Sequence, residues 1–127
     1  MSSRTVLIAP KAPKAIGPYS VAIETNGMVF CAGQTGIDPA TGELVSPDLE
    51  AQTRQALINL KYVLEAAGTN LDKVVKTTVF LRDMADFPKM NAIYADFFPA
   101  DPPARSTIAV AGLPKGAVVE IEAIAVK

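Results

Sequence analysis

Two carboxylates and one guanidinium are the side chains of this sequence best suited to do chemistry. Glu120 and Glu122 are two positions apart in an otherwise apolar stretch near the end of the chain. Side chains alternate between the two faces of a strand, so both carboxylates are expected on one face. The plain alternative is a pair of solvated surface residues, and for Glu122 alone we favour it.

Arg105 is the candidate partner of these carboxylates. It follows Asp101-Pro102-Pro103-Ala104, whose prolines restrict the backbone. A guanidinium offers a planar fork that holds a carboxylate by two parallel hydrogen bonds, which predicts an anion-binding role. The alternative is an internal salt bridge from Arg105 to Glu120 or Glu122, and the spacing alone favours this salt bridge slightly.

Histidine is absent from the sequence, which narrows the chemistry. Its absence removes the usual general base, the usual zinc ligand and the middle member of Ser/His/Asp catalytic sets. Acid and base chemistry must then use carboxylates, Lys, Tyr or Cys. Neither a Walker loop nor a GxGxxG fingerprint occurs, so we expect no cofactor and no metal.

Three further residues have a functional and a structural interpretation. Tyr19 follows Gly17-Pro18 and could present its hydroxyl to a pocket, but an aromatic residue at the start of a strand is more often part of the core. Cys31 lies within a hydrophobic strand and is expected to be an inert buried thiol. Asn91 could face solvent, bend its helix or donate into a pocket, and the sequence does not choose among these.

The elements that must position these residues begin with three strands. Residues 5–8 form a short aliphatic run, and residues 19–25 and 28–32 are two strand-like runs on either side of Asn26-Gly27. Asn-Gly between two such runs is the strongest short signal for a hairpin.

Two amphipathic helices follow. Ser46 is predicted to cap the first, with Pro47 at its first position and Gly68 as its stop. Polar residues such as Gln52 and Asn59 are expected mostly away from its buried face. That face is predicted to carry Leu49, Ala56, Leu57, Leu60, Val63, Leu64 and Ala67. The second helix is predicted from the spacing of Met90, Ile93, Tyr94 and Phe97, with an end at Pro99.

Strands complete the pattern at residues 74–81, 105–110 and 118–126. The last two are predicted to form a hairpin around the turn-rich residues 112–116. Strand, hairpin, helix, strand, helix and hairpin in this order predict an α+β two-layer sandwich, with one mixed sheet and both helices on one face.

The composition fits one domain spanning residues 1–127. Half of the 127 residues are apolar, which is enough to bury a core without disulfides or metal. Twelve Lys and Arg nearly balance thirteen Asp and Glu, which argues against a nucleic-acid partner. No segment approaches the ~20 apolar residues of a membrane span, and no export signal is recognised. We expect a soluble cytoplasmic protein with no membrane partner.

Six segments together resemble the RidA or YjgF family of small deaminases, and the likeness extends over nearly the whole chain. Many members have Cys where this chain has Thr107, and some have Ser where it has Ala32. Neither departure removes Arg105 or Glu120. The matching segments are Ala15-Ile16-Gly17-Pro18-Tyr19-Ser20, Cys31-Ala32-Gly33-Gln34, Val75-Lys76-Thr77-Thr78-Val79-Phe80-Leu81, Asn91-Ala92-Ile93-Tyr94, Pro103-Ala104-Arg105-Ser106-Thr107 and Ile121-Glu122-Ala123-Ile124-Ala125.

The resemblance implies a fold like that of the trimeric chorismate mutases, assembled as a homotrimer with ligand sites between neighbouring subunits. By position, Arg105 resembles the residue that binds the substrate carboxylate, and Glu120 resembles the one that orients the attacking water. Both are the expected catalytic residues. The residues that resemble the lining of the substrate pocket are Tyr19, Gly33, Asn91 and Thr107.

The activity implied by the resemblance is hydrolysis of short 2-imino or 2-enamino acids, such as 2-iminopropanoate and 2-iminobutanoate, to 2-keto acids and ammonia. Two alternatives stay open. One is a module that binds or senses 2-keto acids without turnover, and the other is a ribonuclease or translation inhibitor. The near-neutral charge and the lack of histidine argue against efficient RNA cleavage.

Overall fold

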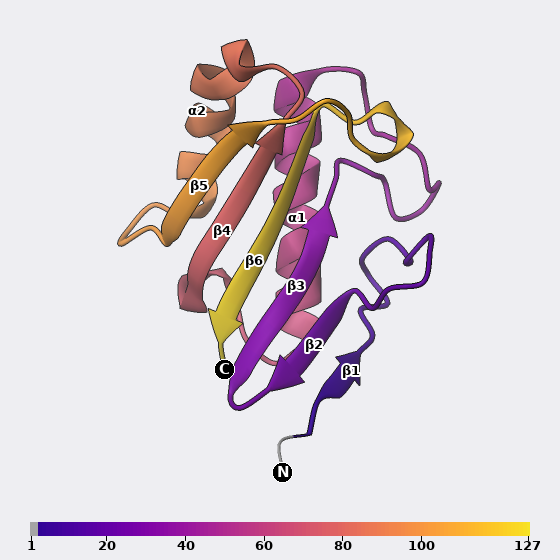
Figure 1. Cartoon of the computed structure of the whole chain (residues 1–127), viewed down its shortest axis with the longest axis vertical. Coiled ribbons are helices and arrows are strands. Elements are labelled where there is room, and N and C mark those ends of the chain that lie inside the picture. The colour runs from indigo at the N-terminus through magenta and orange to yellow at the C-terminus, as the bar shows by residue number, and fades with distance from the viewer. Residues whose placement is uncertain (1–2) are drawn as a thin grey trace.

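The computed structural model describes residues 3–127 as a six-stranded mixed sheet with two α-helices (Figure 1). The strand order is β1-β2-β3-β6-β4-β5, and all neighbours are antiparallel except β4 and β5. The elements are β1 (Thr5–Leu7), β2 (Ala22–Thr25), β3 (Met28–Gln34), α1 (Leu49–Ala66), η1 (Leu71–Lys73), β4 (Val74–Leu81), η2 (Met84–Asp86), α2 (Phe87–Phe97), β5 (Ala104–Ala109), η3 (Pro114–Gly116) and β6 (Val119–Val126).

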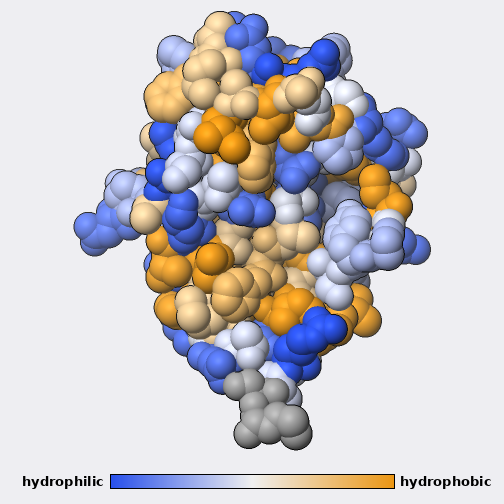
Figure 2. All heavy atoms as spheres, in the orientation of Figure 1, coloured by the Kyte–Doolittle hydropathy of each residue, from blue (hydrophilic) through white to orange (hydrophobic). Residues whose placement is uncertain are grey.

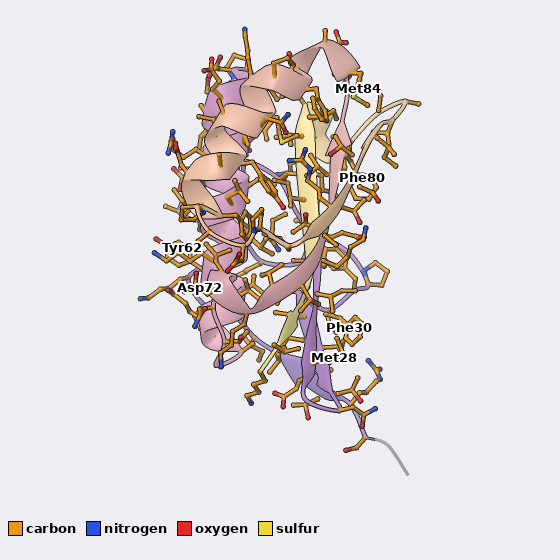
Figure 3. The ribbon with its side chains drawn as sticks, turned by 90° about the vertical axis from the view of Figure 1, so that its left-hand side faces the viewer. Met28, Phe30, Tyr62, Asp72, Phe80 and Met84 are labelled. Atoms are coloured by element: carbon orange, nitrogen blue, oxygen red, sulfur yellow. The ribbon has the colours of Figure 1, made fainter. Side chains whose placement is uncertain are left out.

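Both α-helices lie on the same side of the sheet, which Figure 3 shows edge-on. α1 packs against β3, β6 and α2. The layer between helices and sheet is made of aliphatic side chains, and burying each one contributes about 1.5–3 kcal/mol. Its fully buried members include Leu57, Leu60, Leu64, Val79 and Ile121. This arrangement confirms the predicted two-layer α+β class.

The predicted hairpin at Asn26-Gly27 is also confirmed. β2 and β3 pair from Ala22↔Cys31 to Thr25↔Met28. Asn26 and Gly27 both have positive φ, of 50° and 74°, which is the tight turn whose twist matches that of the two strands. β2 begins three residues later than predicted, because the chain turns at Tyr19, whose N–H donates to Gly17 O over 2.8 Å.

The start of α1 differs from the prediction, and its end does not. Ser46 is not the N-cap: its hydroxyl accepts from Asp48 N over 3.0 Å, which makes a local turn. Asp48 caps the helix instead by accepting from Ala51 N over 2.9 Å. Its carboxylate also lies at the positive end of the helix dipole. Gly68, with φ of 82°, follows the last turn as predicted.

Two amide side chains of α1 that were expected away from the core are buried, and each forms hydrogen bonds with backbone groups outside the helix. Gln52 Nε2 donates to Ser46 O over 2.8 Å, and its Oε1 accepts from Val118 N over 2.9 Å. Asn59 Nδ2 donates to Thr35 O and Ile37 O over 3.1 and 2.8 Å. Buried amides are tolerated when they are hydrogen-bonded, so these two fasten the irregular segment after β3 to the helix.

The predicted hairpin of the last two strands is wrong. β5 pairs with β4 in parallel, and β4 lies between β5 and β6. Parallel neighbours require a crossover, and α2 supplies it. The turn-rich residues 112–116 therefore lead the chain across β4 to β6 rather than back along β5 (Figure 1).

The sheet face opposite the helices carries no helix within residues 3–127 (Figure 3). Met28, Phe30 and Phe80 project from it, and Figure 2 shows hydrophobic surface running over this face, interrupted by hydrophilic residues. Phe30 and Ile108 are 41% and 45% exposed. In the same part of the chain no helix is long and apolar enough to cross a membrane.

Candidate active site

Arg105 and Glu120 lie on opposite faces of the sheet. Directly paired residues of neighbouring strands share a face. Arg105 pairs with Thr77, which is buried under the helices. Glu120 pairs with Phe80, whose side chain points away from the helices (Figure 3). The candidate site is therefore divided, and within one chain its two charged groups do not meet.

Arg105 belongs to the part of the site on the helix side, which we call the arginine half-site. Its guanidinium lies over two aromatic rings of α2, with Cζ 4.7 Å from the Tyr94 centroid and 5.5 Å from the Phe87 centroid. Within residues 3–127 the ion pairs are Arg54–Asp96 and Lys127–Glu24, so Arg105 has no carboxylate partner there. The internal salt bridge that the spacing favoured is therefore wrong. A cation on aromatic faces keeps its N–H groups available.

Asn91 and Thr107 complete the arginine half-site. Thr107 is two positions from Arg105 on β5, so the two side chains share a face. Asn91 lies four positions after Phe87 and three before Tyr94, so it shares their face of α2. Asn91 Oδ1 and Thr107 Oγ1 are buried and have no hydrogen-bond partner among the described residues. Such atoms are rare in folded proteins, and here one lies on the Arg105 face of β5 and the other on the Phe87 and Tyr94 face of α2.

A cavity of about 420 Å³ lies on the sheet face opposite the helices. It is lined by Glu120, Tyr19 and Gly33, together with Glu122. We call this the glutamate half-site. The absence of a side chain at Gly33 makes room for Glu120, because a Cβ there would lie 2.7 Å from Glu120 Cδ. Burial raises the pKa of Glu120, and the negative charge of Glu122 raises it further. The two carboxylates share a face, as the alternation of β6 predicted.

Tyr19 is not a core residue, contrary to the structural interpretation of its sequence position. It is 49% exposed at the cavity, and its hydroxyl accepts from Ile16 N over 3.3 Å. Cys31 faces the core as expected, and burial raises the pKa of its thiol to about 12. A thiol with that pKa stays protonated, so Cys31 is unsuited to nucleophilic chemistry.

The structure thus groups the predicted residues into two sets, Arg105 with Asn91 and Thr107, and Glu120 with Tyr19 and Gly33. Sequence reasoning missed the aromatic support of Arg105. Its signal was present as the spacing of Phe87, Asn91 and Tyr94 at i, i+4 and i+7 on one helix. No cluster of three or more His, Cys, Asp or Glu side chains that could hold a metal ion occurs in the described residues.

The fold and the divided site define a class of small α+β proteins that present, among the described residues, an arginine without a carboxylate partner on one side of a sheet and a half-buried carboxylate on the other. Comparison with known sequences shows which protein family the chain belongs to. Residues 9–127 match the family model described as endoribonuclease L-PSP. The chain belongs to this family, whose members include proteins named Rid, RutC and YjgF.

Individual relatives agree over nearly the full length. The mouse protein named 2-iminobutanoate/2-iminopropanoate deaminase is 48% identical over 124 residues, which cover 98% of this chain and 92% of that protein. A crystal structure of a candidate endoribonuclease L-PSP from Entamoeba histolytica is 52% identical, with a TM-score of 0.96 over 98% of this chain and 100% of the other. Escherichia coli TdcF, solved with bound serine, is 41% identical, with a TM-score of 0.92 over 97% of this chain and 98% of the other.

Proposed function

We propose that this chain hydrolyses short 2-imino and 2-enamino acids, such as 2-iminopropanoate and 2-iminobutanoate, to 2-keto acids and ammonia. The observation that carries the proposal is the unpaired Arg105 guanidinium in a family whose mouse member is named for this reaction. The cavity volume of about 420 Å³ at Glu120 is in the range of small-molecule sites.

Arg105 binds the substrate carboxylate in this proposal. Its fork of N–H donors matches the two oxygens of a carboxylate, and no protein carboxylate within the described residues competes for them. The serine bound to TdcF also carries a carboxylate, which supports an amino-acid-like ligand here. The buried atoms Asn91 Oδ1 and Thr107 Oγ1 then gain partners from the ligand.

Glu120 holds and activates the water. Burial raises the pKa of the Glu120 carboxyl, which makes it a stronger base than an ordinary surface glutamate, and general acid–base catalysis contributes about 10²- to 10⁴-fold. Glu120 takes a proton from the water as the water oxygen forms a bond to C2 of the imine, and the imine nitrogen takes up a proton to give a carbinolamine. The hydroxyl proton of the carbinolamine then moves, through Glu120, to its amino nitrogen, the C–N bond breaks, and ammonia leaves the 2-keto acid behind.

The active unit in this proposal is a homotrimer whose sites lie between neighbouring subunits. The opposite-face positions of Arg105 and Glu120 support it, because two copies are needed to bring the two groups to one ligand. The open apolar sheet face, with Phe30 and Ile108 exposed, supports a partner on that side. A cytoplasmic location and the absence of a cofactor remain predictions from the sequence.

The test is imine hydrolysis by the purified protein. Threonine dehydratase generates 2-iminobutanoate in the assay, and ammonia release is compared with and without the chain, alongside the native mass. Faster release and a mass of three subunits are expected. Binding of 2-oxobutanoate without faster ammonia release would replace the enzyme by a binding or regulatory module.

The family description also names an endoribonuclease, and this remains the second alternative. The sequence has a net charge of −1 and no histidine, which weighs against RNA binding and cleavage. RNA affinity measured at increasing salt separates the two ideas, because a steep decline with salt would support a nucleic-acid ligand.

A further inference from the structure

We propose that Phe87 and Tyr94 are positioning residues for Arg105. Together they form an aromatic shelf, defined by these two rings, that holds the guanidinium by cation–π contacts and leaves its N–H donors free for an anion. The inference rests on the proposed function for its ligand. It assigns the placement of the charge to two residues that do not themselves contact the carboxylate.

The geometry of the shelf comes from one helix and one strand. Phe87 and Tyr94 are seven positions apart on α2, so their side chains lie two turns apart on the same helical face. Arg105 Cζ lies over both rings, 5.5 Å from the Phe87 centroid and 4.7 Å from the Tyr94 centroid. Both distances are within the ~6 Å range of an attractive cation–π contact.

The Tyr94 ring is itself fixed. Its hydroxyl makes a buried hydrogen bond of 2.7 Å with Thr77 Oγ1, and its ring packs on Phe98 with centroids 4.7 Å apart. Thr77 is the direct cross-strand neighbour of Arg105. The same residue of β4, Thr77, therefore helps to position both the Tyr94 ring and Arg105.

An aromatic partner holds the charge in a way that an ion pair would not. A carboxylate partner would occupy the edge of the fork, which is the edge a ligand carboxylate needs. An aromatic ring attracts the cation through its π face and offers no carboxylate oxygen to the N–H donors, so these donors stay available to a ligand. Among the described residues Arg105 has two rings and no carboxylate, which is the arrangement of a preorganised anion receptor.

The first readout is the order of the Arg105 side chain, measured as the order parameter of its Nε–Hε bond by NMR on the full-length protein without ligand. In the wild type we expect Arg105 to be more ordered than the exposed Arg54. Phe87→Leu and Tyr94→Leu are expected to lower the Arg105 value, and Tyr94→Phe, which keeps the ring, to lower it less.

The second readout is ligand affinity. Phe87→Leu and Tyr94→Leu are expected to raise the Kd of 2-oxobutanoate and the KM of the imine by about 2- to 30-fold, with kcat changed by less than about twofold. Thr77→Val and Tyr94→Phe remove the same hydrogen bond, so the double variant should match either single variant.

Phe97→Leu is the matched control. Phe97 lies on the same helix under a different cation, with Arg54 Cζ 6.0 Å from its ring. This variant should leave Arg105 order, Kd and KM unchanged. The proposal is overturned if Phe87→Leu and Tyr94→Leu leave both readouts at wild-type values, or if Phe97→Leu changes them equally. A wild type that neither hydrolyses imines nor binds 2-oxobutanoate, but whose Arg105 order depends on the shelf, would reject the proposed function and retain the positioning role.

Discussion

The arginine and glutamate half-sites hold opposite charges in different surroundings. Arg105 is held by side chains of one helix and forms no ion pair with a carboxylate of residues 3–127. Glu120 lies in a cavity partly lined by irregular segments, where burial raises its pKa and the neighbouring carboxylate of Glu122 raises it further. The first half-site is prepared to receive an anion, and the second to accept a proton. Within one chain, their positions on opposite faces of the sheet also keep Arg105 and Glu120 from forming an ion pair with each other.

The largest expected effect is at the arginine half-site. Arg105→Ala removes both charge-assisted hydrogen bonds to the substrate carboxylate, so kcat/KM for 2-iminobutanoate should fall about 10²- to 10⁴-fold. Arg54→Ala is the control, because Arg54 is exposed and pairs with Asp96. Full activity of the Arg105 variant would exclude the carboxylate clamp.

The next effect tests whether the half-sites belong to different subunits. Glu120→Gln keeps the shape and removes the base, so kcat should fall about 10²-fold. Co-assembly with Arg105→Ala should restore activity to about one quarter of the wild type, since random mixing gives about one quarter of the interfaces both native groups. If mixed assemblies stay as inactive as either parent, the site does not span two chains.

A smaller effect is expected from Gly33→Ala in the glutamate half-site. The added Cβ would collide with the Glu120 carboxylate and displace it, so kcat should fall about 10-fold with little change in substrate affinity. Gly112→Ala is the matched control, because apart from its chain neighbours no described residue has an atom within 4 Å of a Cβ at that position. Equal activity of the two variants would show that the position of Glu120 is not critical.

The smallest effect concerns pH. Burial raises the pKa of Glu120, and the charge of Glu122 raises it further, so Glu122→Gln should move the acid limb of the kcat/KM profile to lower pH. The sign for stability is opposite to that of an ordinary carboxylate. Between the unfolded and folded pKa values of Glu120 the folded state binds more protons, so the stability contribution of this group falls as pH rises. An acid limb that stays in place in Glu122→Gln would contradict the coupling.

Local patterns in the sequence were sufficient for much of the fold. Asn26-Gly27 located its hairpin, the apolar repeat located α1, and the alternation of β6 put Glu120 and Glu122 on one face. Each of these features depends on residues a few positions apart. The buried Gln52 was missed for the opposite reason, since its Oε1 accepts from the backbone N–H of Val118, 66 positions away.

The division of the site could not be read from local pattern. Whether Arg105 shares a face with Glu120 depends on which strand β5 pairs with and in what register, and both are long-range properties. A proline- and glycine-rich connection resembles a hairpin turn regardless of where it leads. The identities of the two charged residues were accessible from the resemblance, but their opposite orientation required the strand order.

The buried Asn59 of α1 stabilises the lining of the cavity. Its amide nitrogen donates to the backbone carbonyls of Thr35 and Ile37, and both of these residues line the cavity beside Glu120. Loops ordinarily open at far lower free energy than the core. Here, moving residues 35–37 away from α1 would leave the buried Asn59 amide without its two acceptors. We therefore expect this segment to resist hydrogen exchange and proteolysis about as long as α1 itself.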